Sequence, residues 1–369
     1  MHSLINERCD IIIPVWNHLK ETRDCIRSIQ KHTNYPYRII VVDNASDDIT
    51  RRYLDGVKEN CGDSIEIIRN EENKGFVKAV NQGMRFSDAL YLCIMNNDTI
   101  ATEGWLSEMI DILLENSDIG IINPSSNTSC QFPGRLDIDT FAKTLKRFKG
   151  EYQELYACRA FSMVVKRAVV VKAGYLDDAY GMGYFDDTDY CKRAQQLGYK
   201  TVRAKASYVY HKESRSFSEI CRKNDIFTEN EKKFIKKWGS QLRVAYILSN
   251  LGSSFEAERV SGNINKIAKT GHQVWIFTAH KFKFRLNLID HENIRFYCYP
   301  KLIFAPVVLY KIWKRKRKKR LHIVLTNNKR FFYLFDLFRS ALDASVYPDR
   351  DSRHIEKILQ EKAYSPVSI

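Results

Sequence analysis

The polar triplet Asn96, Asn97 and Asp98 closes an apolar run, residues 90–95, that has the composition of a buried strand. A carboxylate at this point could hold Mg²⁺ or Mn²⁺, since these cations combine carboxylate oxygens with the phosphate oxygens of a substrate. A single aspartate after a strand is also a common turn former or helix cap. Asp98 therefore indicates a metal site only if other features support one.

Three further carboxylates, those of Asp186, Asp187 and Asp189, fall within four residues. Like charges this close repel one another, so one of them in a cleft could have a raised pKa and act as a general base. The residues that follow have helical character, and the same carboxylates could instead cap the first turn of a helix, where the helix dipole favours anions. We assign Asp189 mainly to this capping role.

A histidine, His211, ends another predicted short apolar strand, residues 206–211. A single histidine is more often a structural hydrogen-bonding residue than a metal ligand. If a metal ion lies at Asp98, however, the neutral imidazole of His211 is a plausible second ligand.

The elements that must position these side chains alternate between strand and helix. Four apolar runs are predicted strands: 10–15, 37–42, 64–69 and 90–95. Three stretches have helical spacing: 19–32, 51–58 and 73–86. Strands joined through helices predict a parallel α/β sheet, and continuous apolar strands predict that both of its faces are covered.

The ligand crevice of such a sheet lies beyond the carboxyl ends of its strands. Three groups of residues fall there: Pro14, Val15, Trp16 and Asn17; Asp43 and Asn44; Asn97 and Asp98. This coincidence favours one shared binding site over three unrelated turns. The chain contains neither a GxGxxG nor a GxxxxGK[ST] motif, so a metal ion is the expected means of neutralising the phosphates of a nucleotide.

The 369 residues suffice for two domains, and the hydrophobic fraction of 44% is ample for packed cores. The nine cysteines form no CxxC pair, which is typical of reduced thiols in a cytosolic protein. The first residues lack the apolar core of a signal peptide, and no run approaches the roughly 18–20 apolar residues of a membrane span. We expect a cytoplasmic protein that is soluble or attached peripherally to the inner face of the membrane.

The net charge of +15 is unevenly distributed, because residues 241–369 contain 24 Lys and Arg against 10 Asp and Glu. This change predicts two domains, 1–240 and 241–369. In the second, strands at 242–248 and 272–278 flank a helix at 256–270, which is a βαβ start of Rossmann type.

A basic run within this second domain has eight Lys or Arg among residues 311–320 and follows an apolar stretch at 302–310. An apolar segment beside a basic one suits an anionic membrane surface. The run could also be a solvated helix face, or it could bind nucleic acid electrostatically. We favour membrane contact through residues 302–320 narrowly over the solvated helix, and we expect no nucleic acid partner.

With these features in order, about the first 220 residues resemble the family 2 glycosyltransferases of the GT-A fold, in which a mostly parallel sheet is flanked by helices. The resemblance is strongest to the branch that builds bacterial surface polysaccharides and includes rhamnosyltransferase-like enzymes. Six segments carry it: "IIIPVWN", "IIVVDNASDD", "NKGFVKAVNQG", "IMNNDT", "GYLDDAYGMGYFDDTDYCKRAQQLGYK" and "VYHKESRSF". Residues 241–369 resemble the start of a GT-B, family 4 glycosyltransferase, and are too few for a whole one.

The resemblance implies an inverting transfer of a sugar from a nucleotide donor, a UDP- or dTDP-sugar being expected. The acceptor would be a hydroxyl of a glycan or lipid-linked molecule, as in O-antigen or capsule synthesis. Asp187 would be the base with Asp186 beside it, Asp98 would hold the metal ion, Mn²⁺ or Mg²⁺, and His211 would lie near the diphosphate. The implied donor-binding residues are Pro14, Val15, Trp16, Asn17, Asp43, Asn73, Gly75, Asn81, Asn97, Asp98 and Met163.

Two departures from the family pattern bear on this expectation. The place of the family's DxD motif is occupied by Asn96, Asn97 and Asp98, so one carboxylate rather than two would contact the metal. The family's Glu-Asp pair is Asp186 and Asp187 here. An inactive module that binds glycan or acts as a scaffold is the competing hypothesis.

Overall fold

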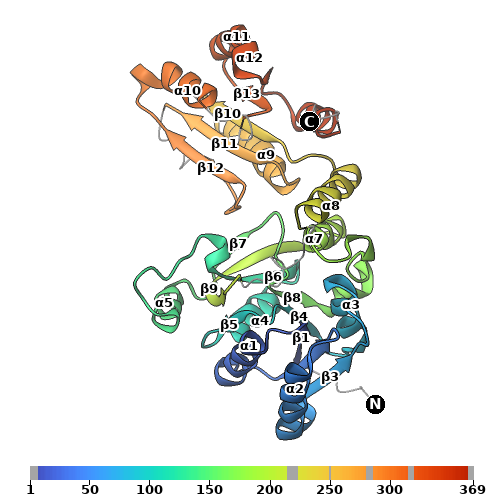
Figure 1. The fold of residues 1–369 in the computed structure, drawn as a ribbon. Coiled ribbons are helices and arrows are strands. Elements are labelled where there is room, and N and C mark those ends of the chain that lie inside the picture. The colour runs from blue at the N-terminus through green and yellow to red at the C-terminus, as the bar shows by residue number, and fades with distance from the viewer. Residues whose placement is uncertain (1–6, 214–222, 249–250, 280–285, 315–319, 365–369) are drawn as a thin grey trace, which may run out of the picture. The chain divides into compact units, whose positions relative to one another are not determined.

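The computed structural model describes residues 7–213, 223–248, 251–279, 286–314 and 320–364. The chain forms two compact units, Met1–Lys233 and Phe234–Ile369, and each contains its own sheet (Figure 1).

The N-terminal unit is built around a mixed sheet with the strand order β3-β2-β1-β4-β8-β6-β9-β5, and β7 pairs with β9. Its strands are β1 (Cys9–Val15), β2 (Tyr37–Asp43), β3 (Ile65–Arg69), β4 (Tyr91–Met95), β5 (Thr99–Ala101), β6 (Ile119–Ser125), β7 (Tyr152–Glu154), β8 (Ser162–Lys166) and β9 (Lys200–His211). Its helices are α1 (Leu19–His32), α2 (Asp48–Cys61), α3 (Phe76–Phe86), α4 (Trp105–Glu115), α5 (Ile138–Leu145), α6 (Arg167–Ala173) and α7 (Asp186–Gln196), and α8 (Lys223–Trp238) follows.

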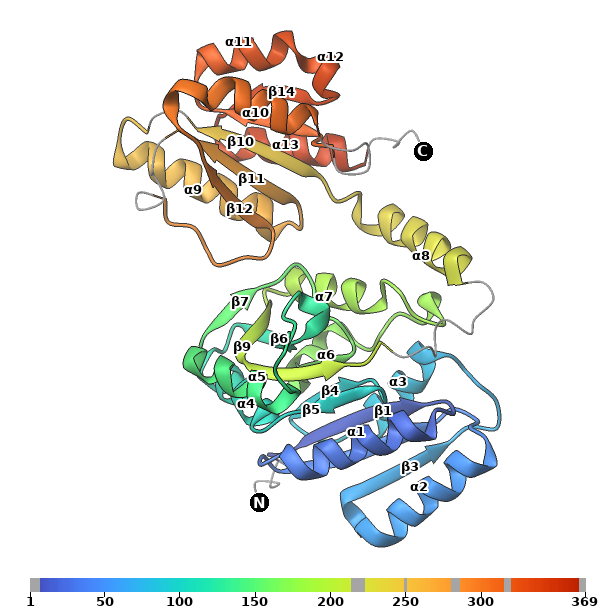
Figure 2. The same ribbon diagram turned by 60° about the vertical axis from the view of Figure 1, so that its left-hand side comes forward.

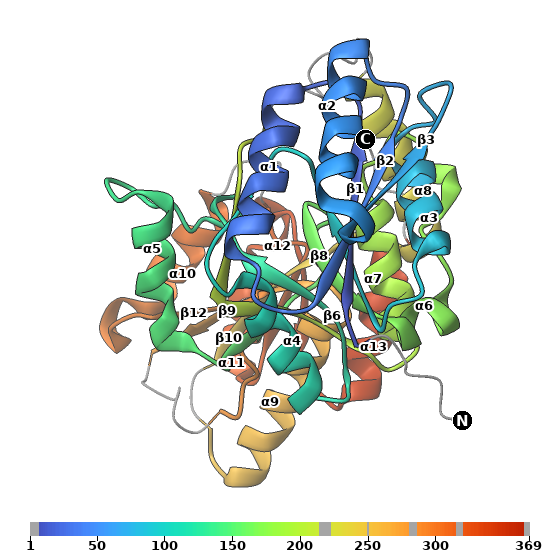
Figure 3. The ribbon, with the colours of Figure 1, turned by 90° about the horizontal axis from the view of Figure 1, so that it is seen from below.

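Helices cover both faces of the parallel part of this sheet, as the continuous apolar strands predict. On one face, Ile11 and Ile13 of β1 share a core with α1, α2 and α4, and Figure 3 shows α1 and α2 side by side over the strands. On the other face, a Cβ added to Gly83 of α3 would lie 2.4 Å from Cγ2 of Ile12. Only glycine therefore allows α3 to pack this closely on β1.

The predicted α/β fold class and the first four strands are confirmed, whereas several other elements differ from the prediction. The helix predicted from residue 73 begins at Phe76, because Asn73 forms part of a hydrogen-bonded loop described below. The strand predicted at 206–211 is the end of the twelve-residue β9. The antiparallel strands β5, β7 and β8 were not predicted from the sequence.

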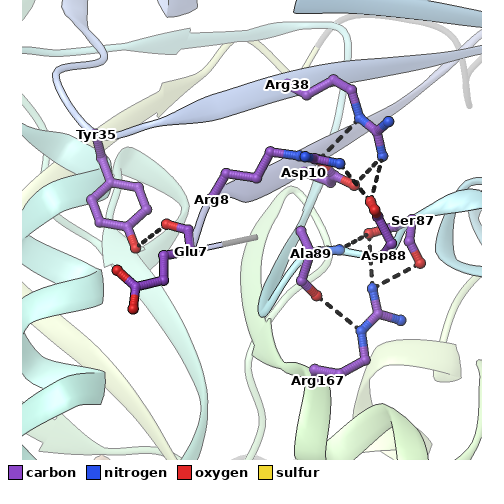
Figure 4. Close-up of polar contacts among 9 residues, drawn as sticks. All are labelled: Glu7, Arg8, Asp10, Tyr35, Arg38, Ser87, Asp88, Ala89 and Arg167. Atoms are coloured by element: carbon purple, nitrogen blue, oxygen red, sulfur yellow. Dashed lines mark hydrogen bonds and ion pairs between the residues drawn. The ribbon is translucent and has the colours of Figure 1, made fainter. Parts of the chain in front are cut away.

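A buried ion cluster closes the edge of the sheet where β1, β2 and β4 begin (Figure 4). Asp10 is fully buried, and its carboxylate lies 2.9 Å from Nε of Arg8 and 2.6 Å from Nη2 of Arg38. Both arginines also contact Asp88, whose side chain is 60% exposed. Beside them, Arg167 donates to the carbonyl oxygens of Ser87 and Ala89 at 2.9 Å. The cluster thus links β1 and β2 to the loop that precedes β4.

The C-terminal unit contains a five-stranded sheet with the order β12-β11-β10-β13-β14, in which every pair is parallel. Its strands are β10 (Arg243–Leu248), β11 (Gln273–Thr278), β12 (Ile294–Cys298), β13 (Ile323–Thr326) and β14 (Ser345–Pro348). Its helices are α9 (Ser254–Lys269), α10 (Phe304–Trp313), α11 (Lys329–Leu337), α12 (Arg339–Leu342) and α13 (Ser352–Ala363). The predicted βαβ start is β10-α9-β11.

Helices also cover both faces of this second sheet. Val244 and Tyr246 of β10 pack in one core with α9 and α13, whereas Ala245 and Ile247 pack in another core with α10, α11 and α12. Among the helices in the described part of the chain, none combines the length and apolar composition needed to cross a bilayer.

Replacing Asp10 should destabilise the N-terminal unit strongly. Asp10→Ala leaves two arginines facing a site with no buried carboxylate, and breaking such a buried pair costs about 3–5 kcal/mol. Asp88→Ala is the matched control, because it removes an exposed partner of the same arginines and should cost at most about 1 kcal/mol. Urea denaturation of the full chain measures both losses. Equal small losses would mean that Asp10 contributes no more than a surface ion pair.

Candidate functional site

The structure brings Asp98 and His211 together, as the sequence predicts. Asp98 lies between β4 and β5 and is 6% exposed, while His211 is the last residue of β9. The short strand β5 pairs antiparallel with β9 so that Thr99 lies opposite His211. As a result, Nε2 of His211 lies 3.0 Å from Oδ1 of Asp98.

His211 is fixed through its backbone and through its ring. Its N–H donates to Oδ1 of Asn127 at 2.9 Å, and its carbonyl oxygen accepts from Nδ2 of Asn127 at 2.8 Å. The ring of Phe161 stacks on the imidazole with 5.3 Å between centroids and 13° between planes. The imidazole is therefore held in one orientation toward Asp98.

Two buried polar atoms at this point have no hydrogen-bond partner among the described residues: Oδ1 of Asn96 and Nδ1 of His211. Nδ2 of Asn96 lies 3.4 Å from Nε2 of His211, so the amide and the imidazole are neighbours. Buried polar atoms without partners are rare in proteins and often mark the place of a water molecule or an ion. Asn97 differs, because its amide donates to Oγ1 of Thr22 on α1 at 2.9 Å.

The side chains of Asp98 and His211 fit a divalent cation. A carboxylate oxygen and an imidazole nitrogen form a donor set that Mn²⁺ accepts, and Mg²⁺ is commonly held by one or two carboxylates together with substrate phosphates. No group of three or more His, Cys, Asp and Glu residues placed to hold a metal occurs within the described ranges. Among the described residues, the side chains placed to hold a metal ion here are those of Asp98 and His211, and substrate or water could supply further ligands.

Asp187 lies in the first turn of α7 and accepts hydrogen bonds at both oxygens. Its Oδ2 accepts from the N–H of Ala160 at 3.2 Å. Its Oδ1 accepts from the N–H of Thr188 at 2.6 Å and from the hydroxyl of Thr188 at 3.0 Å. Hydrogen bonds of this kind stabilise the ionised carboxylate.

The dipeptide Ala160–Phe161 links the two parts of the site. Ala160 donates its N–H to Asp187, and the next residue stacks its ring on His211. The carbonyl oxygen of Phe161 also accepts from the N–H of Asn96 at 2.9 Å. Groups from α7, from β9 and from the end of β4 therefore meet along two consecutive residues.

This dipeptide is held by Asn123 of β6, whose side chain is buried. Oδ1 of Asn123 accepts from the N–H of Arg159 at 2.6 Å, and its Nδ2 donates to the carbonyl oxygens of Arg159 at 2.9 Å and Ser162 at 2.5 Å. The amide thus spans the segment on both sides of Ala160–Phe161. Sequence reasoning missed Asn123, because no motif surrounds it and its partners lie 36–39 residues away.

The three acidic residues of α7 have different environments. Burial, and secondly the neighbouring Asp187, raises the pKa of Asp186 to about 8, and Oδ2 of Asp186 has no partner among the described residues. Burial also raises the pKa of Asp187, against the opposing effect of its hydrogen bonds. Asp189 is fully buried and lies 2.9 Å from Nε of Arg193, which makes it a structural residue.

The backbone just before α7 is strained. Tyr184 and Phe185 both have φ of +68°, in the left-handed region that non-glycine residues rarely adopt. Their rings pack on Phe227 of α8, with centroids 5.5 and 5.2 Å away. Strain of this kind persists only where the surroundings enforce it, and it is concentrated at functional sites.

The other predicted residues near the ends of β1 and β2 include two that are held by a hydrogen bond or an ion pair. Pro14 and Val15 end β1, and Trp16 follows, half-buried. Asn17 has φ of +58° and accepts from the N–H of Asp47 at 2.8 Å. Asp43 is buried and is paired with Nη1 of Arg69 at 3.1 Å.

Asn44, the residue that follows β2, holds the loop of residues 73–75 through hydrogen bonds. Nδ2 of Asn44 donates to Oδ1 of Asn73 at 2.7 Å, and Oδ1 of Asn44 accepts from the N–H of Lys74 at 3.0 Å. Gly75 has φ of +83°, and a Cβ there would lie 3.0 Å from Sδ of Met182. Gly75 therefore lets this loop touch the loop that precedes α7.

Two predicted donor-binding residues have structural surroundings. Asn81 uses its amide oxygen and nitrogen to bind Leu176 and Asp178, at distances of 2.7–3.0 Å, and so holds that loop against α3. Met163 is fully buried in β8, opposite Ile94 of β4. Direct contact of either residue with a donor stays a prediction.

Asp186 should give stability a distinct pH dependence. Because its pKa is raised to about 8, the folded state holds the proton more tightly than the unfolded chain does. The protonated Asp186 contributes its full stabilisation when the pH is below the ordinary range of carboxyl pKa values. This contribution is lost as the pH rises toward 8. Asp186→Asn cannot ionise, so its thermal stability relative to wild type should improve from about pH 5 to pH 8. A difference that stays constant over this range would contradict the assignment.

Asn123 should lower the pKa of Asp187 indirectly, because it holds Ala160 in place. Asn123→Ala frees the 159–162 segment, so Asp187 loses the Ala160 N–H and its pKa should rise further in a ¹³C carboxyl NMR titration. Ser125→Ala is the matched control, because Ser125 is buried on the same strand but donates to the carbonyl oxygens of Ala204 and Lys205 at 3.1 Å. If the Asn123 and Ser125 variants titrate alike, the segment does not depend on Asn123.

Residues 10–170 match the family model described as glycosyl transferase family 2. The glycosyltransferase AglE of Haloferax volcanii is 24% identical over 222 residues, which are 58% of this chain and 69% of AglE. A poly-beta-1,6-N-acetyl-D-glucosamine synthase of Staphylococcus aureus is 22% identical over 176 residues, which are 46% of this chain and 42% of the synthase. The chain therefore spans less than half the length of the synthase.

A solved structure, the mannosyltransferase PcManGT of Pyrobaculum calidifontis in complex with GDP-Man and Mn²⁺, matches with a TM-score of 0.48 and 16% identity. The match covers 63% of this chain and 65% of that chain. The segment matched by the family model includes β1 to β4 and Asp98, and it ends before Asp187 and His211.

Proposed function

We propose, on the premise that residues 10–170 are a glycosyltransferase family 2 domain, that the N-terminal unit transfers a sugar from a nucleoside diphosphate donor to a hydroxyl group. The acceptor is a glycan or a lipid-linked molecule, and the transfer inverts the anomeric carbon. The observation that carries the proposal is the Ala160–Phe161 dipeptide, which has Asp187 hydrogen-bonded at one residue and His211 stacked at the next.

Asp187 is the proposed general base. It accepts the proton of the acceptor hydroxyl while that oxygen attacks the anomeric carbon from the side opposite the diphosphate. The bond from carbon to the diphosphate oxygen breaks, and the nucleoside diphosphate leaves with the electron pair. This single displacement inverts the configuration and needs no covalent enzyme intermediate.

The environments of the two acidic residues support this division of roles. Asp187 accepts hydrogen bonds from Ala160 and Thr188 that stabilise its ionised form, while Oδ2 of Asp186 has no partner among the described residues. Burial raises the pKa of Asp186 and so favours its protonated form, and we assign the charge of the pair to Asp187. Two neighbouring carboxyl groups whose environments differ in this way suit acid-base chemistry.

Asp98 and His211 are the proposed ligands of a divalent metal ion, Mn²⁺ or Mg²⁺. When bound, the ion supplies positive charge that stabilises the diphosphate leaving group. Ligation through Nε2 of His211 requires the imidazole proton on Nδ1, the atom that has no partner among the described residues. The hydrogen bond between Nε2 and Asp98 would be replaced on metal binding.

The nucleotide is proposed to bind along the carboxyl ends of β1, β2 and β4, where such ligands bind in α/β sheets. The residues assigned to this part of the site are Pro14, Val15, Trp16, Asn17, Asp43, Asn73, Gly75, Asn97 and Asp98. A UDP- or dTDP-sugar is the proposed donor, and synthesis of a surface polysaccharide at the cytoplasmic face of the membrane is the proposed setting. The likeness of residues 241–369 to the start of a GT-B enzyme stays a prediction.

Donor turnover tests this proposal. Wild type should release nucleoside diphosphate from one of a panel of UDP-, dTDP- and GDP-sugars, and only with Mn²⁺ or Mg²⁺ present. Asp187→Asn should lower the rate by about 100-fold or more, the usual share of a general base, and still bind the nucleotide. Asp98→Asn should lose the metal-dependent part of nucleotide binding in calorimetry.

Asp118→Asn is the control, because Asp118 is half-exposed and paired with Lys200 at 2.7 Å, outside the site. It should match wild type in rate and in binding. Nucleotide binding without turnover of any donor would favour an inactive binding module. Turnover that survives in the Asp187 variant would overturn the assignment of the base.

A further inference from the structure

Helices α10 and α11 lie side by side on one face of the C-terminal sheet (Figures 1 and 2). Phe304 of α10 and Phe331 of α11 have ring centroids 5.4 Å apart. One side of α10 packs into the core through the buried side chains of Phe304, Val308 and Ile312. The side chain of Phe335 is the corresponding buried contact of α11. These buried side chains fix which side of each helix is left toward solvent.

The outer sides of these helices and their ends expose large apolar residues. Leu302 is 97% exposed, Leu337 78% and Trp313 62%. We call the following set the docking face: Leu302, Tyr310, Trp313, Tyr333, Leu337 and Phe338. Single exposed apolar residues are normal, but a group on two packed helices indicates an interaction surface.

The segments that form this docking face also carry exposed positive charge. The stretches 301–314 and 329–342 contain six basic residues and one acidic residue. The basic residues are Lys301, Lys311, Lys314, Lys329, Arg330 and Arg339. The acidic one, Asp336, lies 3.6 Å from Arg339 and so offsets one of these charges.

This composition favours a lipid surface over the other possible occupants. Protein interfaces are depleted in lysine, whereas four of the six cations here are lysines. Nucleic acid would use the charge but would leave Leu302 and Leu337 without a role. Anionic headgroups attract Lys and Arg, while Trp and Tyr settle at the boundary between headgroups and acyl chains.

We propose that the docking face on α10 and α11 binds the surface of an anionic bilayer. The inference does not depend on the proposed transfer reaction, because it rests on the C-terminal unit alone. It replaces the linear segment predicted from the sequence, residues 302–320, with a surface made by two helices. Part of that segment, residues 315–319, lies outside the described residues and is not needed for the proposal.

The test is co-sedimentation of the full chain with vesicles of phosphatidylcholine, with and without phosphatidylglycerol. Wild type should bind the anionic vesicles at least about tenfold more tightly, since each nearby cation contributes about 1 kcal/mol. A variant with Leu302→Ser, Trp313→Ala and Leu337→Ser should lose about tenfold or more in affinity. A second variant, Lys311→Glu with Lys314→Glu, should lose affinity for the anionic vesicles only.

Phe255→Ser is the matched control, because Phe255 is 76% exposed on α9, a helix of the opposite face. It should bind vesicles as wild type does, and circular dichroism should show all variants folded. Three outcomes would overturn the proposal: no vesicle binding by wild type, equal binding by the apolar variant, or a self-associated wild type that the apolar variant turns into monomers. Tighter binding to DNA than to anionic vesicles would assign the face to nucleic acid instead.

Discussion

The side-chain amide of Asn123 is the interaction on which the candidate site depends. It bonds to Arg159 and Ser162 and so fixes the two residues between them, which carry the contacts to Asp187, His211 and Asn96. Asparagine suits this task because one planar group offers an acceptor and a donor in a fixed arrangement. The buried position on β6 shields these bonds from competing water. A single side chain on a rigid strand thus sets the relation between the base and the proposed metal ligands.

Buried polar and charged groups are paired at one edge of the N-terminal sheet, whereas some at the other edge have no partner among the described residues. At the edge where β1 begins, the carboxylate of Asp10 is paired with two arginines, so its burial is compensated. At the carboxyl edge, Oδ2 of Asp186 and Nδ1 of His211 have no partner among the described residues. Uncompensated polar groups reduce stability, and they are concentrated at functional sites. The contrast supports the proposal that the chemistry takes place at the carboxyl edge.

Local patterns predicted the parts of the molecule that depend on short stretches of sequence. The apolar runs gave β1 to β4, and the polar residues after them marked Asp98 and Asp43 as lying at one edge of the sheet. The pairing of Asp98 with His211 was also predicted, on the condition that a metal ion lies at Asp98. Asn123 and the stacking of Phe161 were not, because both depend on β8 running antiparallel beside β4, which no local signal specifies. The same holds for α11, whose part in the docking face follows only from its packing against α10.

A crystal structure of the full chain with Mn²⁺ and a nucleoside diphosphate would test whether Asp98 and His211 hold the metal ion against the diphosphate. We expect an anomalous manganese signal within coordination distance of Oδ1 of Asp98 and Nε2 of His211, with diphosphate oxygens among its other ligands. The nucleoside should then lie along the carboxyl ends of β1 and β2. Manganese bound elsewhere, or a nucleotide bound while the hydrogen bond between Asp98 and His211 stays intact, would contradict the account.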